Sequence, residues 1–211
     1  MVSETTLYFG FLTVAENSRC GLIGGYLVLN HAGRPVEFHC TSPVRANRAQ
    51  EILYGATLEA FLYGEQIAQT LVNRAKTKPV VVLSDMPQVL AAQEFIEMPL
   101  VFIEPSSQDS SDLKNKFKIV SETPLPIDFS KKNDGENQKK SISEILASVS
   151  GINTSRWSEQ KIGRYRLAAP ELSAHSAAET VAALETVSHA IDLAEPFERI
   201  CLAVEEAQRA A

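Results

Sequence analysis

Residues 24–64 read GGYLVLNHAGRPVEFHCTSPVRANRAQEILYGATLEAFLYG and contain the signals that decide the fold. An apolar strand ends near Leu29, and residues 30–35 then supply the residue types that reverse a chain. Residues 36–41 resume as a third strand, which is expected to run antiparallel to the second. From Ala49 onward apolar residues follow helical spacing, and Gly55 is expected to kink or interrupt the helix. This stretch therefore predicts a hairpin and a helical segment that packs on it.

The residues before this stretch predict two further features of the same sheet. Residues 7–14 (LYFGFLTV) are rich in aromatic and β-branched residues and are typical of a strand buried on both faces. Residues 22–29 form a second apolar strand, in which Gly24 and Gly25 indicate a bulge or a close backbone approach. The sheet is therefore expected to begin with three antiparallel strands.

The residues after it predict a parallel crossover. Residues 79–83 (PVVVL) are the clearest buried strand in the chain, and residues 84–87 (SDMP) begin a short helix that runs to about Glu94. Residues 99–103 form the next buried strand, and a strand–helix–strand unit of this kind is right-handed and parallel. The predicted fold class is α+β, close to α/β: a mixed sheet with three antiparallel strands followed by a parallel unit, plus C-terminal helices.

Composition divides the chain into three expected parts. Residues 1–105 hold the mixed-sheet core, and residues 106–140 are polar enough to be expected as a flexible linker. Residues 141–211 are expected to be mainly helical and to pack on the core or on a partner. An Ala-rich helix pair over 176–210 is suited to helix–helix contact.

Charge and cysteine usage narrow the function classes. The 211 residues carry a formal net charge of −6, which provides no overall field to attract a polyanion, so nucleic acid is not expected as a partner. The three cysteines show no spacing typical of a zinc or redox site. The chain starts without the features of a secretory signal and contains no membrane-length apolar run, so a cytoplasmic protein without a membrane partner is expected.

Glu37 and His39 are the first pair that could carry chemistry. On a strand they share one face, whereas Val36, Phe38 and Cys40 share the other face and are expected to point inward. A carboxylate beside an imidazole can fix its tautomer and raise its basicity, which suits acid–base chemistry or metal binding. The alternative is a solvated sheet face that happens to carry both residues.

Asp85 and Glu51 are the other two candidates. Asp85 follows a central parallel strand, and ligands of open α/β sheets bind outside the carboxyl ends of such strands. Alternatively, Ser84 or Asp85 caps the following helix. Glu51 lies in the first turns of the first helix, where it could share a site with Asp85 or interact only with the helix dipole.

The order of these elements resembles the ribonuclease H-like superfamily. The residues that carry the resemblance are Gly24-Gly25-Tyr26 in the second strand, residues 47–51 (NRAQE) opening the first helix, and Leu83-Ser84-Asp85 closing the fourth strand. The resemblance implies two magnesium ions held by acidic residues, which correspond to Glu51 and Asp85 here. The first strand departs from the pattern because it carries no acid, and Glu51 is one residue out of phase with the family's spacing.

Two functions follow from these observations. The first is a non-catalytic protein-interaction or assembly module without a cofactor, which associates with itself or a protein partner through the C-terminal helices. The alternative is a metal-dependent hydrolase or nuclease of ribonuclease H-like topology that uses Glu51, Asp85 and possibly Glu37 and His39, with Mg or Mn as cofactor.

Overall fold

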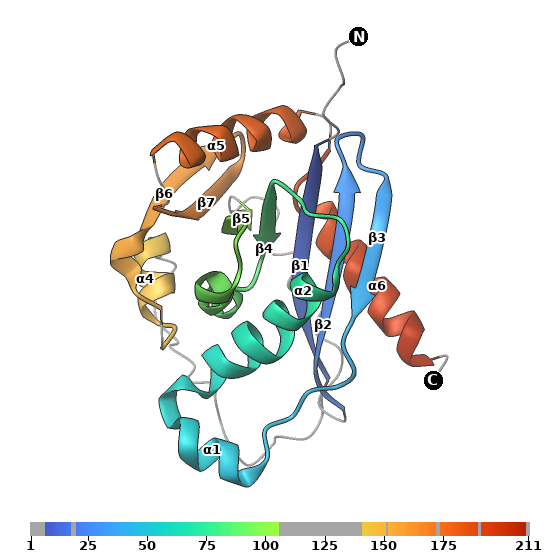
Figure 1. The fold of residues 1–211 in the computed structure, drawn as a ribbon, viewed down its shortest axis with the longest axis vertical. Helices are drawn as coiled ribbons and strands as arrows, with labels where there is room; N and C mark the ends of the chain where they lie inside the picture. Colours follow the sequence, from blue (N-terminus) through green and yellow to red (C-terminus); the bar gives the residue numbers. More distant parts are fainter. Residues whose placement is uncertain are drawn as a thin grey trace.

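The computed structural model describes residues 7–17, 20–105, 141–150, 152–171, 174–189 and 191–209. They form one seven-stranded mixed sheet with the order β3-β2-β1-β4-β5-β7-β6 and helices packed on it (Figure 1). The predicted α+β class, with a mixed sheet and C-terminal helices, is confirmed. The expected linker at 106–140 lies outside the described residues.

The antiparallel part consists of β1 (Tyr8–Asn17), β2 (Gly21–Asn30) and β3 (Pro35–Cys40). β1 and β2 pair along their whole length, and β3 is an edge strand paired only with β2. The turn between β2 and β3 forms because the Asn30 side chain accepts hydrogen bonds from the backbone amides of Ala32 and Arg34. Gly33 in this turn has a φ of 73°, which favours glycine.

The parallel part consists of β4 (Val81–Ser84), the short 3₁₀ segment η3 (Pro87–Phe95) and β5 (Leu100–Pro105). β4 lies between β1 and β5 and is parallel to both. All four residues of β4 are buried, which explains its uninterrupted apolar sequence. The predicted crossover is therefore present.

The helical segment between β3 and β4 is broken several times. It comprises α1 (Arg48–Tyr54), η1 (Gly55–Thr57), the wider π-type helix η2 (Ala60–Gln69) and α2 (Thr70–Arg74). Asn47 and Gln50 form a capping box that starts α1. Gly55, with a φ of 49°, ends α1, as the sequence predicted.

The residues after 140 contribute both strands and helices. They form α4 (Ile142–Ala147), η4 (Thr154–Arg156), β6 (Trp157–Ile162), β7 (Tyr165–Pro170), α5 (Ala174–Ser188) and α6 (Glu195–Arg209). β7 pairs with β5, and β6 closes the far edge of the sheet. The segment from 141 to 211 thus completes the same sheet as the N-terminal part.

Two hydrophobic cores lie on opposite faces of the sheet. Side chains of η2, α2, η3 and α4 pack on one face, and side chains of α5 and α6 pack on the other. Gly24 and Gly25 of β2 face opposite layers: a Cβ on Gly24 would lie 2.2 Å from Ile67 Cγ2, and one on Gly25 would lie 2.2 Å from Ile200 Cγ2. The close backbone approach predicted for these glycines therefore occurs on both faces.

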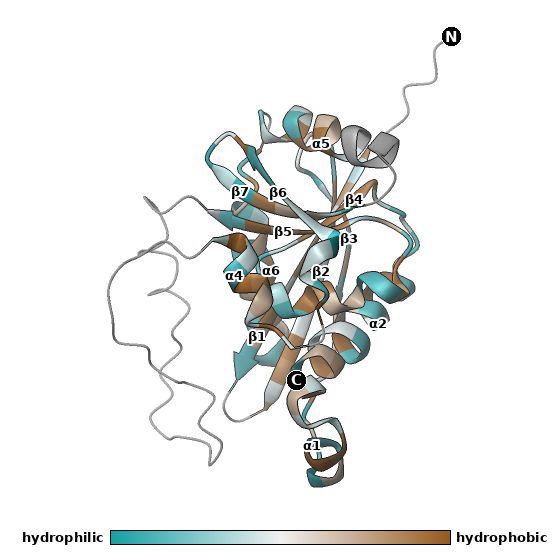
Figure 2. Cartoon of the chain, turned by 90° about the vertical axis from the view of Figure 1, so that its left-hand side faces the viewer, coloured by the Kyte–Doolittle hydropathy of each residue, from teal (hydrophilic) through white to brown (hydrophobic). Residues whose placement is uncertain are grey.

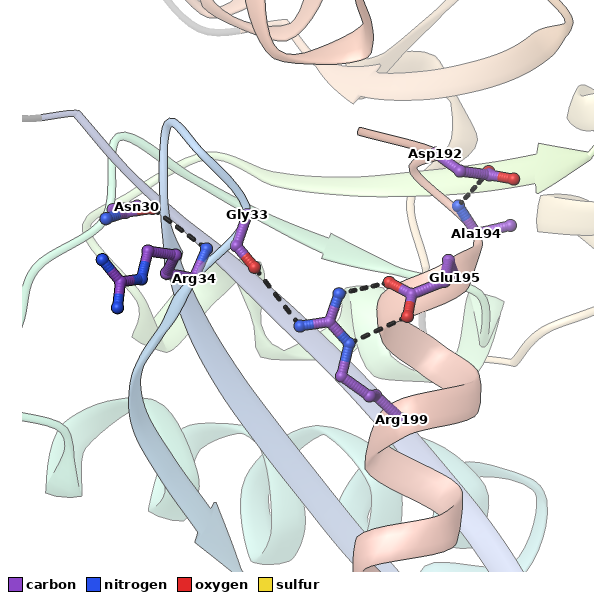
Figure 3. Close-up of polar contacts among 7 residues, drawn as sticks. All are labelled: Asn30, Gly33, Arg34, Asp192, Ala194, Glu195 and Arg199. Atoms are coloured by element: carbon purple, nitrogen blue, oxygen red, sulfur yellow. Dashed lines mark hydrogen bonds and ion pairs between the residues drawn. The ribbon is translucent and has the colours of Figure 1, made fainter. Parts of the chain in front are cut away.

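The first turns of α6 are tied to the β2–β3 turn by Arg199 (Figure 3). Its guanidinium donates to the carbonyl oxygen of Gly33 at 3.3 Å and to Glu195 Oε1 at 2.9 Å. Asp192 accepts a hydrogen bond from the backbone amide of Ala194 just before the helix begins. These contacts fix the direction in which α6 crosses β2 and β1.

Some apolar side chains predicted to point inward are exposed. Val36 and Phe38 of β3 are 46% and 38% exposed, and Cys40 is exposed as well. The reason is that β3 is an edge strand, whereas α6 packs on β1 and β2. Ile52 is 66% exposed because α1 buries none of its residues. In Figures 1 and 2, α1 lies at the lower end of the molecule, away from β4.

Within the described residues, no helix is long and apolar enough to span a bilayer.

Candidate functional site

Asp85 lies at the carboxyl end of β4, between two longer strands. Ser84, the last residue of β4, is paired with Leu12 of β1 and Phe102 of β5. Beyond these partners β1 continues to Asn17, and β5 continues to Pro105. This is the position at which open α/β sheets bind ligands.

The Asp85 carboxylate is partly buried and only partly satisfied. Its Oδ1 atom is buried and has no hydrogen-bond partner among the described residues. The Thr13 side chain forms a hydrogen bond with the carboxylate, but burial outweighs it and raises the pKa of Asp85 to about 6. The carboxyl group can therefore gain or lose a proton near neutral pH, which suits acid–base chemistry.

The helix-capping alternative for Asp85 is not what the structure shows. Met86 is the N-cap of η3, and no side chain caps it. Ser84 Oγ accepts a hydrogen bond from the Met86 amide at 3.2 Å, so Ser84 stabilises this turn in place of Asp85.

Thr13 and Cys201 belong to the surroundings of Asp85 and were not among the predicted site residues. Thr13 is 3% exposed and lies on the face of β1 that α6 covers, as do Phe9 and Phe11. A signal was available for Thr13, because it is the only polar side chain in the apolar run 7–14. Burial, together with the negative charges of Asp85, Glu205 and Glu198, raises the pKa of the Cys201 thiol to about 12. Cys201 is therefore a protonated thiol and not a nucleophile.

Glu51 does not meet Asp85. It lies on α1, where its carboxylate forms an ion pair with Arg48 at 2.9 Å, and α1 is separated from β4 in both views of the fold (Figures 1 and 2). Within the described part of the chain, no group of three or more His, Cys, Asp or Glu side chains could hold a metal ion. The structure therefore does not bring Glu51 and Asp85 together.

Glu16 is not a substitute for the missing first-strand acid. It lies on β1, but on the face opposite Thr13, where it accepts a hydrogen bond from Tyr63 Oη at 2.6 Å. Burial and the charge of Glu16 raise the pKa of Tyr63, so this pair remains a phenol bonded to a carboxylate. It connects β1 to η2.

Glu37 and His39 serve a structural purpose. Glu37 accepts hydrogen bonds from the backbone amides of Lys76 and Thr77, each at 2.9 Å, and its Oε1 lies 2.7 Å from His39 Nε2. The amide of Lys76, followed by the contact with His39, lowers the pKa of Glu37 to about 2. The pair ties the edge strand to the loop before β4 and lies away from Asp85 in the sheet order.

Replacing Glu37 by Gln is expected to lower the free energy of unfolding by about 1–2 kcal/mol at neutral pH, because charge-assisted hydrogen bonds are weakened. Since the folded-state pKa lies below the ordinary value of 4.5, this stabilisation is present above pH 4.5 and is lost as the pH falls towards 2. Denaturant unfolding of both chains between pH 2 and 7 measures it. A difference that does not shrink at acid pH would contradict this role.

A hollow of about 510 Å³ lies elsewhere, at the turn between β6 and β7. Arg164 and Tyr165 both donate hydrogen bonds to Asp192 at this place, and the guanidinium of Arg164 lies 5.3 Å from the centre of the Tyr165 ring. None of the residues predicted from the sequence lines this hollow. Arg164, Tyr165 and Asp192 of this hollow are engaged with each other.

Comparison with known proteins yields distant structural neighbours. No family model and no curated protein matches the chain. Endonuclease V of Ciona intestinalis, in complex with a 23mer DNA containing an inosine, is 11% identical, has a TM-score of 0.36 and covers 85% of this chain and 77% of that one. The same enzyme in complex with a 24mer DNA is 13% identical, has a TM-score of 0.37 and covers 85% of this chain and 78% of that one. Human ENDOV is 12% identical, has a TM-score of 0.40 and covers 99% of this chain and 87% of that one.

These neighbours are consistent with the ribonuclease H-like resemblance of the sequence, and they correct two predictions. Because they are nucleases, two of them in complex with DNA, the preference for a non-catalytic interaction module is wrong, and so is the expectation that nucleic acid is excluded as a partner. The apolar side chains of α5 and α6 that suggested self-association are buried in the chain's own core, for example Leu184 and Ile200. Similarity this distant transfers no residue role.

Proposed function

We propose that the protein is a hydrolase that acts on a phosphodiester of a nucleic acid and uses Asp85 as its acid–base residue. The observation that carries the proposal is the Asp85 carboxyl at the end of β4, with one buried oxygen unpartnered and a pKa of about 6. The substrate class is the one that the ribonuclease H-like order of elements implies.

Asp85 can supply one defined step in such a reaction. In its protonated form it donates the proton to the leaving oxygen while water attacks phosphorus, so the phosphorus–oxygen bond breaks without an alkoxide leaving. The ionised carboxylate then recovers a proton from the attacking water. Thr13 holds one side of the carboxyl group and keeps it in place during both steps.

Arg45 offers a cation for the substrate backbone on the same side of the sheet. The Cγ atom of Arg45 lies 2.5 Å from the position that a Cβ on Gly21 would occupy. Gly21 pairs with Asn17 at the end of β1. Arg45 is exposed and forms no ion pair with any residue that the structure describes. Along β1, the four residue-to-residue steps from Thr13 to Asn17 span roughly 13 Å, a distance that a few nucleotides cover.

Replacing Arg45 by Ala is expected to weaken binding of a short oligonucleotide and to reduce the slope of log K against log salt by roughly one, since one phosphate contact is lost. Fluorescence anisotropy at several salt concentrations measures it. Lys78→Ala is the matched control, because Lys78 precedes β4 at the opposite end and pairs with exposed Glu97 at 3.3 Å. Equal slopes for both variants would contradict the assignment.

The function itself is tested by incubating the full chain with labelled single- and double-stranded DNA and RNA, with and without EDTA. The expected result is cleavage that persists in EDTA and is lost in Asp85→Asn. Binding without cleavage, or cleavage that Asp85→Asn retains, would overturn the proposed function.

A further inference from the structure

We infer that Thr13 decides whether a divalent cation can bind beside Asp85: the site as it stands does not hold one, and a carboxylate at position 13 would create a metal site. The inference concerns the same site as the proposed function and relies on it only for the location. Its experiment measures metal binding and not cleavage, so the two can fail separately.

The donor set around Asp85 is too small for a catalytic cation. Mg²⁺ and Mn²⁺ are bound through oxygen ligands, usually including carboxylates, and a two-metal centre needs several carboxylates that converge. Among the described residues Asp85 belongs to no group of three or more potential ligands, and its Oδ1 atom is buried without a hydrogen-bond partner. The Thr13 hydroxyl is neutral and cannot balance a cation's charge.

The other acidic residues near the sheet do not complete the set. Glu16 lies on the opposite face and is bonded to Tyr63, and Glu51 is paired with Arg48 on α1. Glu198 and Glu205 of α6 influence the Cys201 thiol, yet the described residues form no cluster of three potential ligands. The mismatch is thus specific to the first strand, where the ribonuclease H-like resemblance implies an acid.

Thr13 is the position at which one substitution would remove the mismatch. Leu12 pairs with Ser84 in the parallel ladder, so Thr13 and Asp85 follow side by side on neighbouring strands. An aspartate at position 13 would therefore place two carboxylates next to each other on one face of the sheet. Two carboxylates at that separation repel unless they share a proton or a cation. Mg²⁺ and Mn²⁺ typically complete such a pair with water, so the pair suffices for binding.

The test is saturable Mn²⁺ binding to the full chain, followed by electron paramagnetic resonance and by the shift in Tm. Five chains are compared: the natural chain, Asp85→Asn, Thr13→Asp, the uncharged control Thr13→Asn, and Thr13→Asp combined with Asp85→Asn. Only Thr13→Asp is expected to show one site, roughly tenfold tighter or more than any residual binding of the others, and a rise in Tm with Mn²⁺.

Two results would overturn the inference. One is saturable binding of a single Mn²⁺ by the natural chain that Asp85→Asn removes. The other is a folded Thr13→Asp chain, with an unchanged circular dichroism spectrum, that gains no site. The comparison of the natural chain with Asp85→Asn decides whether the natural site binds a divalent cation, even if Thr13→Asp does not fold.

Discussion

Replacing Asp85 by Asn is expected to lower the cleavage rate by about 10²–10⁴-fold, the contribution typical of a positioned acid–base group. The same substitution is expected to raise the free energy of unfolding above pH 6. Asparagine has nearly the same shape and can still bond to Thr13, but it carries no charge to desolvate. Loss of activity together with a gain of stability is the signature of a residue kept for function.

The pH dependence of this gain follows from the sign of the pKa shift. Burial raises the pKa of Asp85 from its ordinary value of 3.8 to about 6, so the folded state binds the proton more tightly than the unfolded state does. The stability that protonated Asp85 contributes is fully present below pH 3.8 and is lost as the pH rises through 6. Above pH 6 the ionised group costs the fold roughly 3 kcal/mol, at about 1.4 kcal/mol per pKa unit.

Denaturant unfolding of both chains between pH 3.5 and 8 measures this difference. The natural and Asp85→Asn chains are expected to coincide near pH 3.5 and to diverge as the pH rises. Glu97→Gln is the control, because the Glu97 side chain is 87% exposed and its loss should change stability little at any pH. Parallel curves for the natural and Asp85→Asn chains would show that Asp85 is not desolvated.

Replacing Gly25 by Ala is expected to lower the free energy of unfolding by about 1–3 kcal/mol, the usual cost of overpacking a core. The new Cβ would lie 2.2 Å from Ile200 Cγ2 and 3.1 Å from Val204 Cγ2, so α6 must shift. Ile200 is 1% exposed and has little room to move. Thermal or denaturant unfolding measures the loss.

Gly24→Ala is the matched control, since it adds the same methyl group one residue earlier but against Ile67 and Leu71 on the other face. Both variants should be destabilised, yet only Gly25→Ala should accelerate alkylation of Cys201, the half-buried thiol on α6. Combining Gly25→Ala with Ile200→Ala should cost less than the sum of the two, as expected for residues in contact. Equal alkylation rates in both single variants would contradict the layer assignment.

The backbone plan could be predicted from local patterns. The turn residues around Gly33, the uninterrupted apolar run at β4 and the paired glycines of β2 each report a requirement of the chain at that place. Gly55 likewise ended its helix because a positive φ is a property of the residue itself. Such signals depend only on residues that are close in the chain, so they can be recognised in a single sequence.

The roles of side chains could not be predicted in the same way. Glu37 and His39 looked like a reactive pair, but the amides of Lys76 and Thr77, some 40 residues away, make Glu37 a structural acceptor. Val36 and Phe38 have the alternation of a half-buried strand, yet their exposure depends on where α6 lies. Electrostatics and burial depend on neighbours that are distant in the sequence.

The sequence by itself determined the first five strands and which of them run antiparallel or parallel, the break at Gly55 and the place of Asp85 at the end of a parallel strand. Only the tertiary structure decided that Asp85 stands beside Thr13, outside any group of three potential metal ligands among the described residues, and that Glu51 lies on a separate helix. The physical reason is that strand order follows from periodicity and turn chemistry along the chain, whereas a site depends on which side chains the packing of β1, β4 and α6 brings together.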